Sequence, residues 1–197
     1  MKKIISALSL LMLILTLGAC GTSNNNSNED QATETSSLED IQGEKAGESH
    51  VVQVEMINTE GTKMGLATLK QAANGVNVMI DVTGLAKGTH GFHIHETGMC
   101  EPPDFESAGD HFNPTDMKHG FDHPDGPHAG DLPNLEVGED GKVQESFVNE
   151  MVTLKKGEPN SLLREGGTAL VIHADPDDQV SQPSGHSGAR IACGVIK

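Results

Sequence analysis

Hydrophobic residues recur with a period of two along much of the chain after residue 50. Two runs show this most clearly: Val52, Val54 and Met56, and Val76, Val78, Ile80 and Val82. Because successive side chains of a strand point to opposite faces, the pattern predicts strands with one buried face. Further strand candidates cover residues 66–69, 92–95, 137–148, 168–173 and 190–196. About eight short strands, with no convincing helix, predict an all-β fold that is an antiparallel sandwich or barrel.

Turn residues separate these strands. Asn74 and Gly75 can take the positive dihedrals of a tight hairpin turn, and Gly138 to Gly141 form a second turn candidate. Residues 96–134 break the pattern, since they are crowded with Gly, Pro, Asp and His. A loop of this length is usually either functional or disordered.

The N-terminus is typical of an export signal. Lys2 and Lys3 precede an apolar run over residues 4–17, which is shorter than the ~20 residues of a spanning helix. Leu17-Gly18-Ala19-Cys20 resembles the lipobox of bacterial lipoproteins, so we expect cleavage before Cys20 and lipidation of its sulfur. The alternative is an ordinary secretory signal in which Cys20 is incidental. The lipoprotein reading places the protein on the outer face of the cytoplasmic membrane or of another envelope membrane.

Composition divides the remainder into a tether and one domain. Residues 21–49 are rich in Ser, Thr, Asn and acids, and too poor in aliphatic residues to offset the entropy of ordering. Residues 50–197 hold 10 Lys and Arg against 22 Asp and Glu, a formal net charge of −12. Such an acidic domain excludes a basic face for nucleic acid, and it leaves the lipid anchor as the only expected membrane contact.

Histidines and one aspartate are the candidate functional residues. His93 and His95 flank Ile94 in a strand candidate, so both rings project from one face. His173 closes another strand, and the long segment adds His111, His119, His128 and Asp131. Taken singly, each histidine could be a surface or hydrogen-bonded core residue. Together they indicate metal binding, because imidazoles suit zinc and copper, and three imidazoles with a carboxylate suit tetrahedral zinc.

Six blocks of the sequence resemble copper-zinc superoxide dismutases, in the order typical of that family. They are Gly91-Phe-His-Ile-His-Glu96, Gly109-Asp-His-Phe-Asn-Pro114, His119-Gly120, His128-Ala-Gly-Asp-Leu-Pro-Asn134, Val171-Ile-His173 and Gly188-Ala-Arg-Ile-Ala-Cys-Gly-Val-Ile196. The resemblance implies an eight-stranded antiparallel Greek-key β-barrel, immunoglobulin-like, with a long metal-binding loop. It implies two metal groups with His111 shared as a bridge: copper on His93, His95, His111 and His173, and zinc on His111, His119, His128 and Asp131.

The implied activity is dismutation of superoxide to dioxygen and hydrogen peroxide. Zinc is redox-inert, so copper would carry the electron chemistry and zinc would be structural. His111 could carry a proton toward the forming peroxide. Arg190 matches the family's anion-guiding arginine, with a surface salt bridge as the alternative.

The resemblance also implies supporting residues. Asp177 corresponds to the carboxylate that links a copper histidine to a zinc histidine, and Asp178 competes for that role. Cys100 and Cys193 correspond to an intrasubunit disulfide. His90 fits a buried, hydrogen-bonding position. No role is assigned to His50, His123 or His186, although His123 could bind stray metal.

Three functions remain open from the sequence. The first is an exported, lipid-anchored superoxide dismutase, and the second is an exported zinc- or copper-binding protein of the same fold with little or no dismutase activity. The third is a purely structural cell-surface sandwich, which the ligand-type residues disfavour. Residues 179–187 carry no lysine where many family members place steering charges, so we expect good but submaximal turnover. We expect the protein to be a monomer or a homodimer.

Overall fold

The computed structural model describes residues 50–197, and the signal peptide and tether predicted for residues 1–49, including Cys20, lie outside the described residues. The described residues form nine strands and one short 3-10 helix, Glu106–Ala108. The strands are β1 (Val51–Asn58), β2 (Lys63–Ala72), β3 (Gly75–Thr83), β4 (Gly88–His90), β5 (Phe92–His95), β6 (Leu135–Val137), β7 (Lys142–Asn149), β8 (Thr168–His173) and β9 (Arg190–Ile196). In this part of the chain, no helix is long and apolar enough to cross a membrane.

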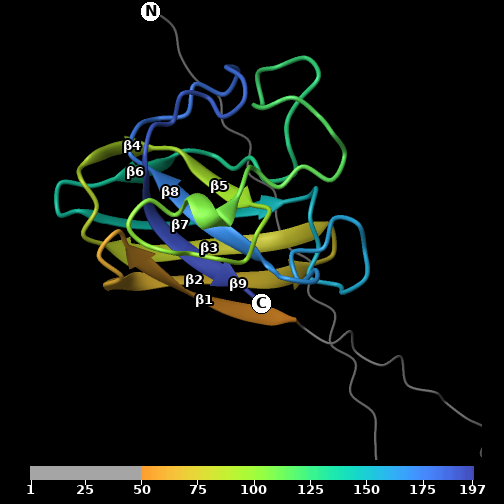
Figure 1. Ribbon diagram of the computed structural model, residues 1–197, viewed down its shortest axis with the longest axis horizontal. Coiled ribbons are helices and arrows are strands. Elements are labelled where there is room, and N and C mark those ends of the chain that lie inside the picture. The colour runs from red at the N-terminus through yellow and green to blue at the C-terminus, as the bar shows by residue number, and fades with distance from the viewer. Residues whose placement is uncertain (1–49) are drawn as a thin grey trace, which may run out of the picture. The chain divides into compact units, whose positions relative to one another are not determined.

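All the strand pairs are antiparallel. Seven strands form one sheet in the order β5-β8-β9-β1-β2-β3-β7, and β4 pairs with β6 in a second, small sheet (Figure 1). The last strand, β9, returns to lie beside the first, β1, so the order of the strands in the sheet departs from their order in the chain, as in a Greek key. The all-β Greek-key prediction is confirmed.

The structure contains one strand more than the sequence predicts. β4 was not anticipated, because it has only three residues and contains a glycine. Only Gly91 separates β4 from β5, so the chain passes from the small sheet to the large one at this residue. The backbone of Gly91 lies close to Ser187, since a Cβ added at Gly91 would lie 2.8 Å from the Cβ of Ser187.

The main core is filled by side chains that are buried at every second position of a strand. In β3 the buried residues alternate with more exposed ones, as predicted: Val76, Val78, Ile80 and Val82. The hairpin between β2 and β3 is also confirmed, but its two loop residues are Ala73 and Asn74 rather than Asn74 and Gly75. The positive φ falls on Gly75, where a side chain would clash with the backbone of Asn149 in β7.

β8 is buried on both faces. Leu170 and Ile172 lie in the main core, while Ala169 and Val171 lie in a smaller cluster with Phe105. Its neighbour β5 divides in the same way, because Ile94 joins the main core. The two histidines that flank it must then point to the opposite face. The parity of β5 and β8 therefore places polar ligands outside the barrel core.

The long segment between β5 and β6 crosses this outer face. It forms turns and the single 3-10 helix, and it carries no strand of its own. Two of its residues nevertheless form isolated antiparallel bridges to β5, His111 with His95 and Asp131 with His93. These bridges bring the distant histidines of the loop next to the histidines of the strand.

Candidate metal centre

The structure brings together the seven residues predicted to bind metal. They form two overlapping groups in which one ligand atom per residue lies within 4.8 Å of the others. The first group is His93, His95, His111 and His173, and the second is His111, His119, His128 and Asp131. His111 belongs to both groups, as the resemblance implied.

Each histidine of the first group that comes from a strand has one ring nitrogen engaged. His93 Nε2 donates to Asp177 Oδ2 at 2.7 Å. His95 Nδ1 donates to the carbonyl of Gly109 at 2.9 Å, and His173 Nδ1 donates to that of Gly188 at 3.2 Å. Because a neutral imidazole has one N–H and one lone pair, the other nitrogen of each ring is left as an acceptor.

The opposite nitrogens make no hydrogen bond. Among the described residues, the buried side-chain atoms without a partner include His93 Nδ1 and the Nε2 atoms of His95, His111 and His173. A buried polar atom left unpaired costs roughly 1–3 kcal/mol, so four in one cluster call for a common partner. Four nitrogen lone pairs fit a copper ion, and neutral imidazole is the form that binds metals.

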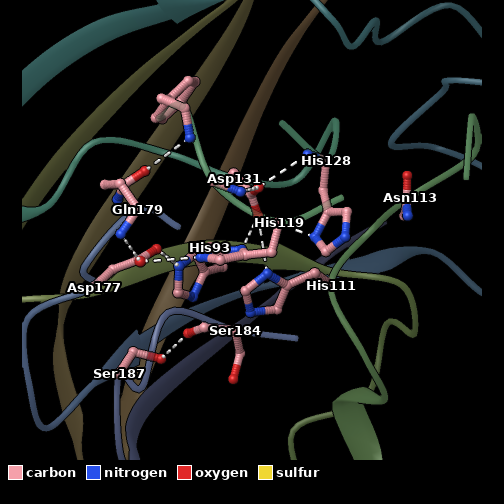
Figure 2. A network of polar contacts seen from close by, with 12 residues as sticks. His93, His111, Asn113, His119, His128, Asp131, Asp177, Gln179, Ser184 and Ser187 are labelled. Atoms are coloured by element: carbon pink, nitrogen blue, oxygen red, sulfur yellow. Dashed lines mark hydrogen bonds and ion pairs between the residues drawn. The ribbon is translucent and has the colours of Figure 1, made fainter. Parts of the chain in front are cut away.

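The second group converges on one carboxylate oxygen. Asp131 Oδ1 lies 2.9 Å from His111 Nδ1, 3.0 Å from His119 Nδ1 and 3.3 Å from His128 Nδ1 (Figure 2). The other oxygen, Oδ2, accepts hydrogen bonds from the backbone N–H groups of Gly120 and His128. Three imidazoles and one carboxylate at these spacings fit a tetrahedral zinc site.

Burial determines the protonation of the first group. It lowers the pKa of His111 to about 4 and that of His173 to about 3, and it lowers the pKa of His93 and of His95 below the ordinary value. These four rings are therefore neutral at pH 7, which leaves their lone pairs available to a metal.

Carboxylates reverse the effect at His119. Burial alone would lower its pKa, but hydrogen bonds with Asp131 and Asp177 raise it to about 9. Burial alone would raise the pKa of each carboxyl group, yet the same hydrogen bonds, with others from His111 and His93, hold both values well below the ordinary one. Both carboxylates are thus ionised and offer negative charge to the centre.

Asp177 links the two groups. Its Oδ2 accepts the bond from His93, and its Oδ1 lies 3.0 Å from His119 Nε2 (Figure 2). Asp178, the alternative from the sequence, is exposed; its Oδ1 accepts backbone hydrogen bonds from Val180 and Ser181. The position that joins a residue of each group therefore belongs to Asp177.

Arg190 lies beside the first group at a cavity of about 470 Å³. The cavity is also lined by His95, His111 and His173, and by acidic Glu96 and Asp110. The guanidinium donates to the carbonyls of Phe105 at 2.7 Å and Gly109 at 2.8 Å, rather than to a carboxylate. The hydrogen bonds of Arg190 differ from those of a surface salt bridge, and they leave its positive charge available to an anion in the cavity.

A disulfide between Cys100 and Cys193 confirms the predicted pairing, and its Cα atoms are 5.7 Å apart. It attaches the start of the long loop to β9. Phe105 packs in the same buried cluster as Cys193, and Cys100 packs against that cluster. The segment whose carbonyls hold Arg190 is therefore fixed to the barrel.

The remaining histidines lie outside the two groups. His90 is buried, and its ring nitrogens lie 2.7 Å from the carbonyl of His173 and 2.9 Å from that of Ala86, as expected of a hydrogen-bonding residue. His186 is exposed near Asp178, His50 is exposed, and His123 Nδ1 accepts the backbone N–H of Asp125.

The sequence did not indicate the carbonyl of Gly109, which holds both His95 and Arg190. A backbone acceptor has no residue signature, so no sequence signal could have found it. The side chains of Asn134 and Gln182, which bond the backbones of Asp177 and His119, were also missed. Carboxamides are common in loops and do not indicate such contacts.

The fold and the two groups define a β-barrel protein with two adjacent candidate metal sites that have one histidine in common. A family model described as copper/zinc superoxide dismutase matches residues 63–196. The chain belongs to this family, whose cofactors are copper and zinc. The prediction of a superoxide dismutase is confirmed at the level of the family.

Relatives support this assignment. The chain is 54% identical over 144 residues to superoxide dismutase [Cu-Zn] 2 of Aquifex aeolicus, covering 73% of this chain and 84% of the relative. It is 42% identical over 198 residues to superoxide dismutase-like protein YojM of Bacillus subtilis, covering 96% of this chain and 95% of the relative. The crystal structure of a SOD-like protein from Bacillus subtilis is similar with a TM-score of 0.73 at 45% identity, covering 76% of this chain and 100% of that chain.

Proposed function

We propose that His93, His95, His111 and His173 hold copper, and that His111, His119, His128 and Asp131 hold zinc. The observation that carries the proposal is the set of four buried, unpaired ring nitrogens beside a cavity that Arg190 also lines. Nitrogen ligands suit copper, whereas a mixed set of three imidazoles and a carboxylate suits zinc. His111 serves both groups, since its Nε2 belongs with the first and its Nδ1 faces Asp131.

Copper, when bound, supplies reversible one-electron chemistry, which dismutation of superoxide requires. The residues of the chain supply the rest. Arg190 attracts and orients a small anion at the cavity, because its charge is permanent and its fork is held by two carbonyls. When it is not bound to copper, His111 Nε2 would be a ring nitrogen that can hold a proton and release it toward the product peroxide. Asp177 fixes the ring orientations of His93 and His119 through hydrogen bonds.

The test is metal analysis of purified protein, with a dismutase assay before and after copper loading. We expect one copper and one zinc per chain and activity that depends on copper. His173→Ala should abolish copper-dependent activity, while His186→Ala, whose side chain is 80% exposed outside both groups, should match the wild type. Zinc bound without copper-dependent activity would instead support the exported metal-binding protein.

We also propose that the mature protein is anchored by a lipid on Cys20 at the outer face of a bacterial envelope membrane. The support is the sequence alone: a charged start, an apolar run and the Leu-Gly-Ala-Cys tetrapeptide. Mass spectrometry of the mature N-terminus should find a diacylglyceryl-modified cysteine. Cys20→Ser should leave the protein unprocessed, and an unmodified, cleaved N-terminus in the wild type would exclude the anchor.

A further inference from the structure

The loop that carries the zinc residues and the loop between β8 and β9 bond each other through carboxamide side chains. Asn134, at the end of the first loop, pairs with the backbone of Asp177 in the second. The Asn134 Nδ2 donates to the Asp177 carbonyl at 2.9 Å, and the Asp177 N–H donates to Asn134 Oδ1 at 2.9 Å. One side chain thus satisfies both backbone groups of a residue that links the two metal groups.

Gln182 makes the reverse contact. It belongs to the second loop, and it pairs with the backbone of His119 in the first. The His119 N–H donates to Gln182 Oε1 at 3.0 Å, while Gln182 Nε2 donates to the carbonyls of His119 at 3.0 Å and Val180 at 3.0 Å. The side-chain amide therefore uses its oxygen and both N–H groups, and it bonds both the backbone N–H and the backbone carbonyl of His119.

His119 depends on this contact more than the other zinc residues do. His111 and Asp131 are held by backbone bridges to the strand β5. His128 lies three residues from Asp131, and its N–H donates to that carboxylate. His119 instead lies in residues 113–127, which form turns and bends but no strand. Its backbone needs a partner from elsewhere, and Gln182 provides it.

We propose that Gln182 is a positioning residue for zinc, acting through the backbone of His119. The inference rests on the proposed role of His119 as a zinc ligand. The pairing fixes the point from which the ring reaches Asp131 with Nδ1 and Asp177 with Nε2. Without it, the ring must be ordered at the moment of binding, which weakens the hold on the metal.

The experiment measures the rate at which zinc passes from the loaded protein to a chromogenic chelator. Gln182→Ala should release zinc roughly tenfold faster than the wild type, as is typical when a contact supporting a ligand is lost. Gln182→Glu keeps an acceptor for the His119 N–H but cannot donate to its carbonyl, so it should fall between the two. The matched control is Gln144→Ala, which removes an exposed bond to Asp81 on the sheet.

Two further readouts separate positioning from general stability. Gln182 is exposed, so the urea midpoint of the metal-free Gln182→Ala variant should equal that of the wild type. Cobalt placed in the zinc group should show an altered visible spectrum in Gln182→Ala but not in Gln144→Ala. A lowered metal-free midpoint with an unchanged cobalt spectrum would overturn the inference, because the effect would then be structural.

The outcome distinguishes this inference from the proposed function. If wild-type protein binds no zinc, the proposed function fails and the inference fails with it. If the wild type binds zinc and Gln182→Ala releases it at the wild-type rate, only the inference is overturned. Faster release with a shifted cobalt spectrum and an unchanged metal-free midpoint is the expected result.

Discussion

Arg190 and His95 share one hydrogen-bond acceptor, the backbone carbonyl of Gly109. The distances are 2.8 Å from Arg190 Nη2 and 2.9 Å from His95 Nδ1. The residue proposed to guide the substrate and a residue proposed to hold copper are therefore set by the same peptide group. The shared carbonyl therefore helps to fix the distance between the Arg190 guanidinium and the His95 ring, which the flexible arginine side chain alone would not fix.

Arg190→Ala should lower kcat/KM for superoxide by about tenfold, because the local attraction and orientation of the anion are lost. Arg190→Lys should recover part of the rate, since it keeps the charge but not the fork. Pulse radiolysis over a range of ionic strength measures the effect. The wild-type rate should fall as salt rises, and a flat salt profile would contradict attraction by Arg190. Arg164→Ala, which removes the chain's other arginine, is the control.

Glu96 and Asp110 should slow the approach of superoxide. Both are exposed acidic residues that line the cavity with Arg190. Glu96→Gln and Asp110→Asn should each raise kcat/KM about twofold at low ionic strength, and the gain should vanish at high salt. Glu158→Gln makes the same charge change at an exposed residue outside the cavity lining, so it should leave the rate unchanged. An equal gain in that control would point to net charge instead of local repulsion.

Removal of the disulfide should lower stability and activity together. It closes a separation of 93 residues, which the chain-entropy model values at roughly 4 to 5 kcal/mol. The double variant Cys100→Ser with Cys193→Ser should therefore unfold at lower urea. Its kcat/KM should also fall, because the loop whose carbonyls hold Arg190 loses its covalent attachment. Wild-type protein reduced and then reoxidised should regain both properties; a fully active double variant would show that the loop holds Arg190 unaided.

The metal-free protein should lose stability as the pH falls below 6.5. His111 and His173 have folded pKa values of about 4 and about 3, below the ordinary 6.5. Between these values the unfolded chain binds protons that the folded chain does not, so unfolding is favoured by about 1.4 kcal/mol per pH unit for each group. Urea unfolding at pH 7, 6, 5 and 4 measures the slope. His173→Gln should reduce it by one group, whereas His186→Gln should leave it unchanged.

Much of the site could be predicted because strand parity is visible in a sequence. The alternation around Ile94 places His93 and His95 on one face, and the structure keeps that face outside the core. The loop ligands were predicted from their motifs, since nothing in residue spacing alone shows that His111 folds back beside His95. The contact between His111 and His95 is a backbone bridge, and no side-chain pattern in the sequence predicts such a bridge.

Other features were not accessible from the sequence for physical reasons. β4 is too short for a period to be visible, and the choice between Asp177 and Asp178 depends on the path of a loop rich in turns. The role of Gln182 depends on two loops meeting in space. Such contacts depend on tertiary structure, so local patterns do not reveal them.

The two-faced burial of β5 and β8 has a consequence for how this protein can change over evolutionary time. In both strands, side chains of one parity lie in the main core, while the histidines His93, His95 and His173 have the other parity and belong to the first ligand group. An insertion or deletion of one residue within either strand would send imidazoles inward and aliphatic groups toward the ions. We therefore expect changes in length to be tolerated in the connecting segments and not within these two strands.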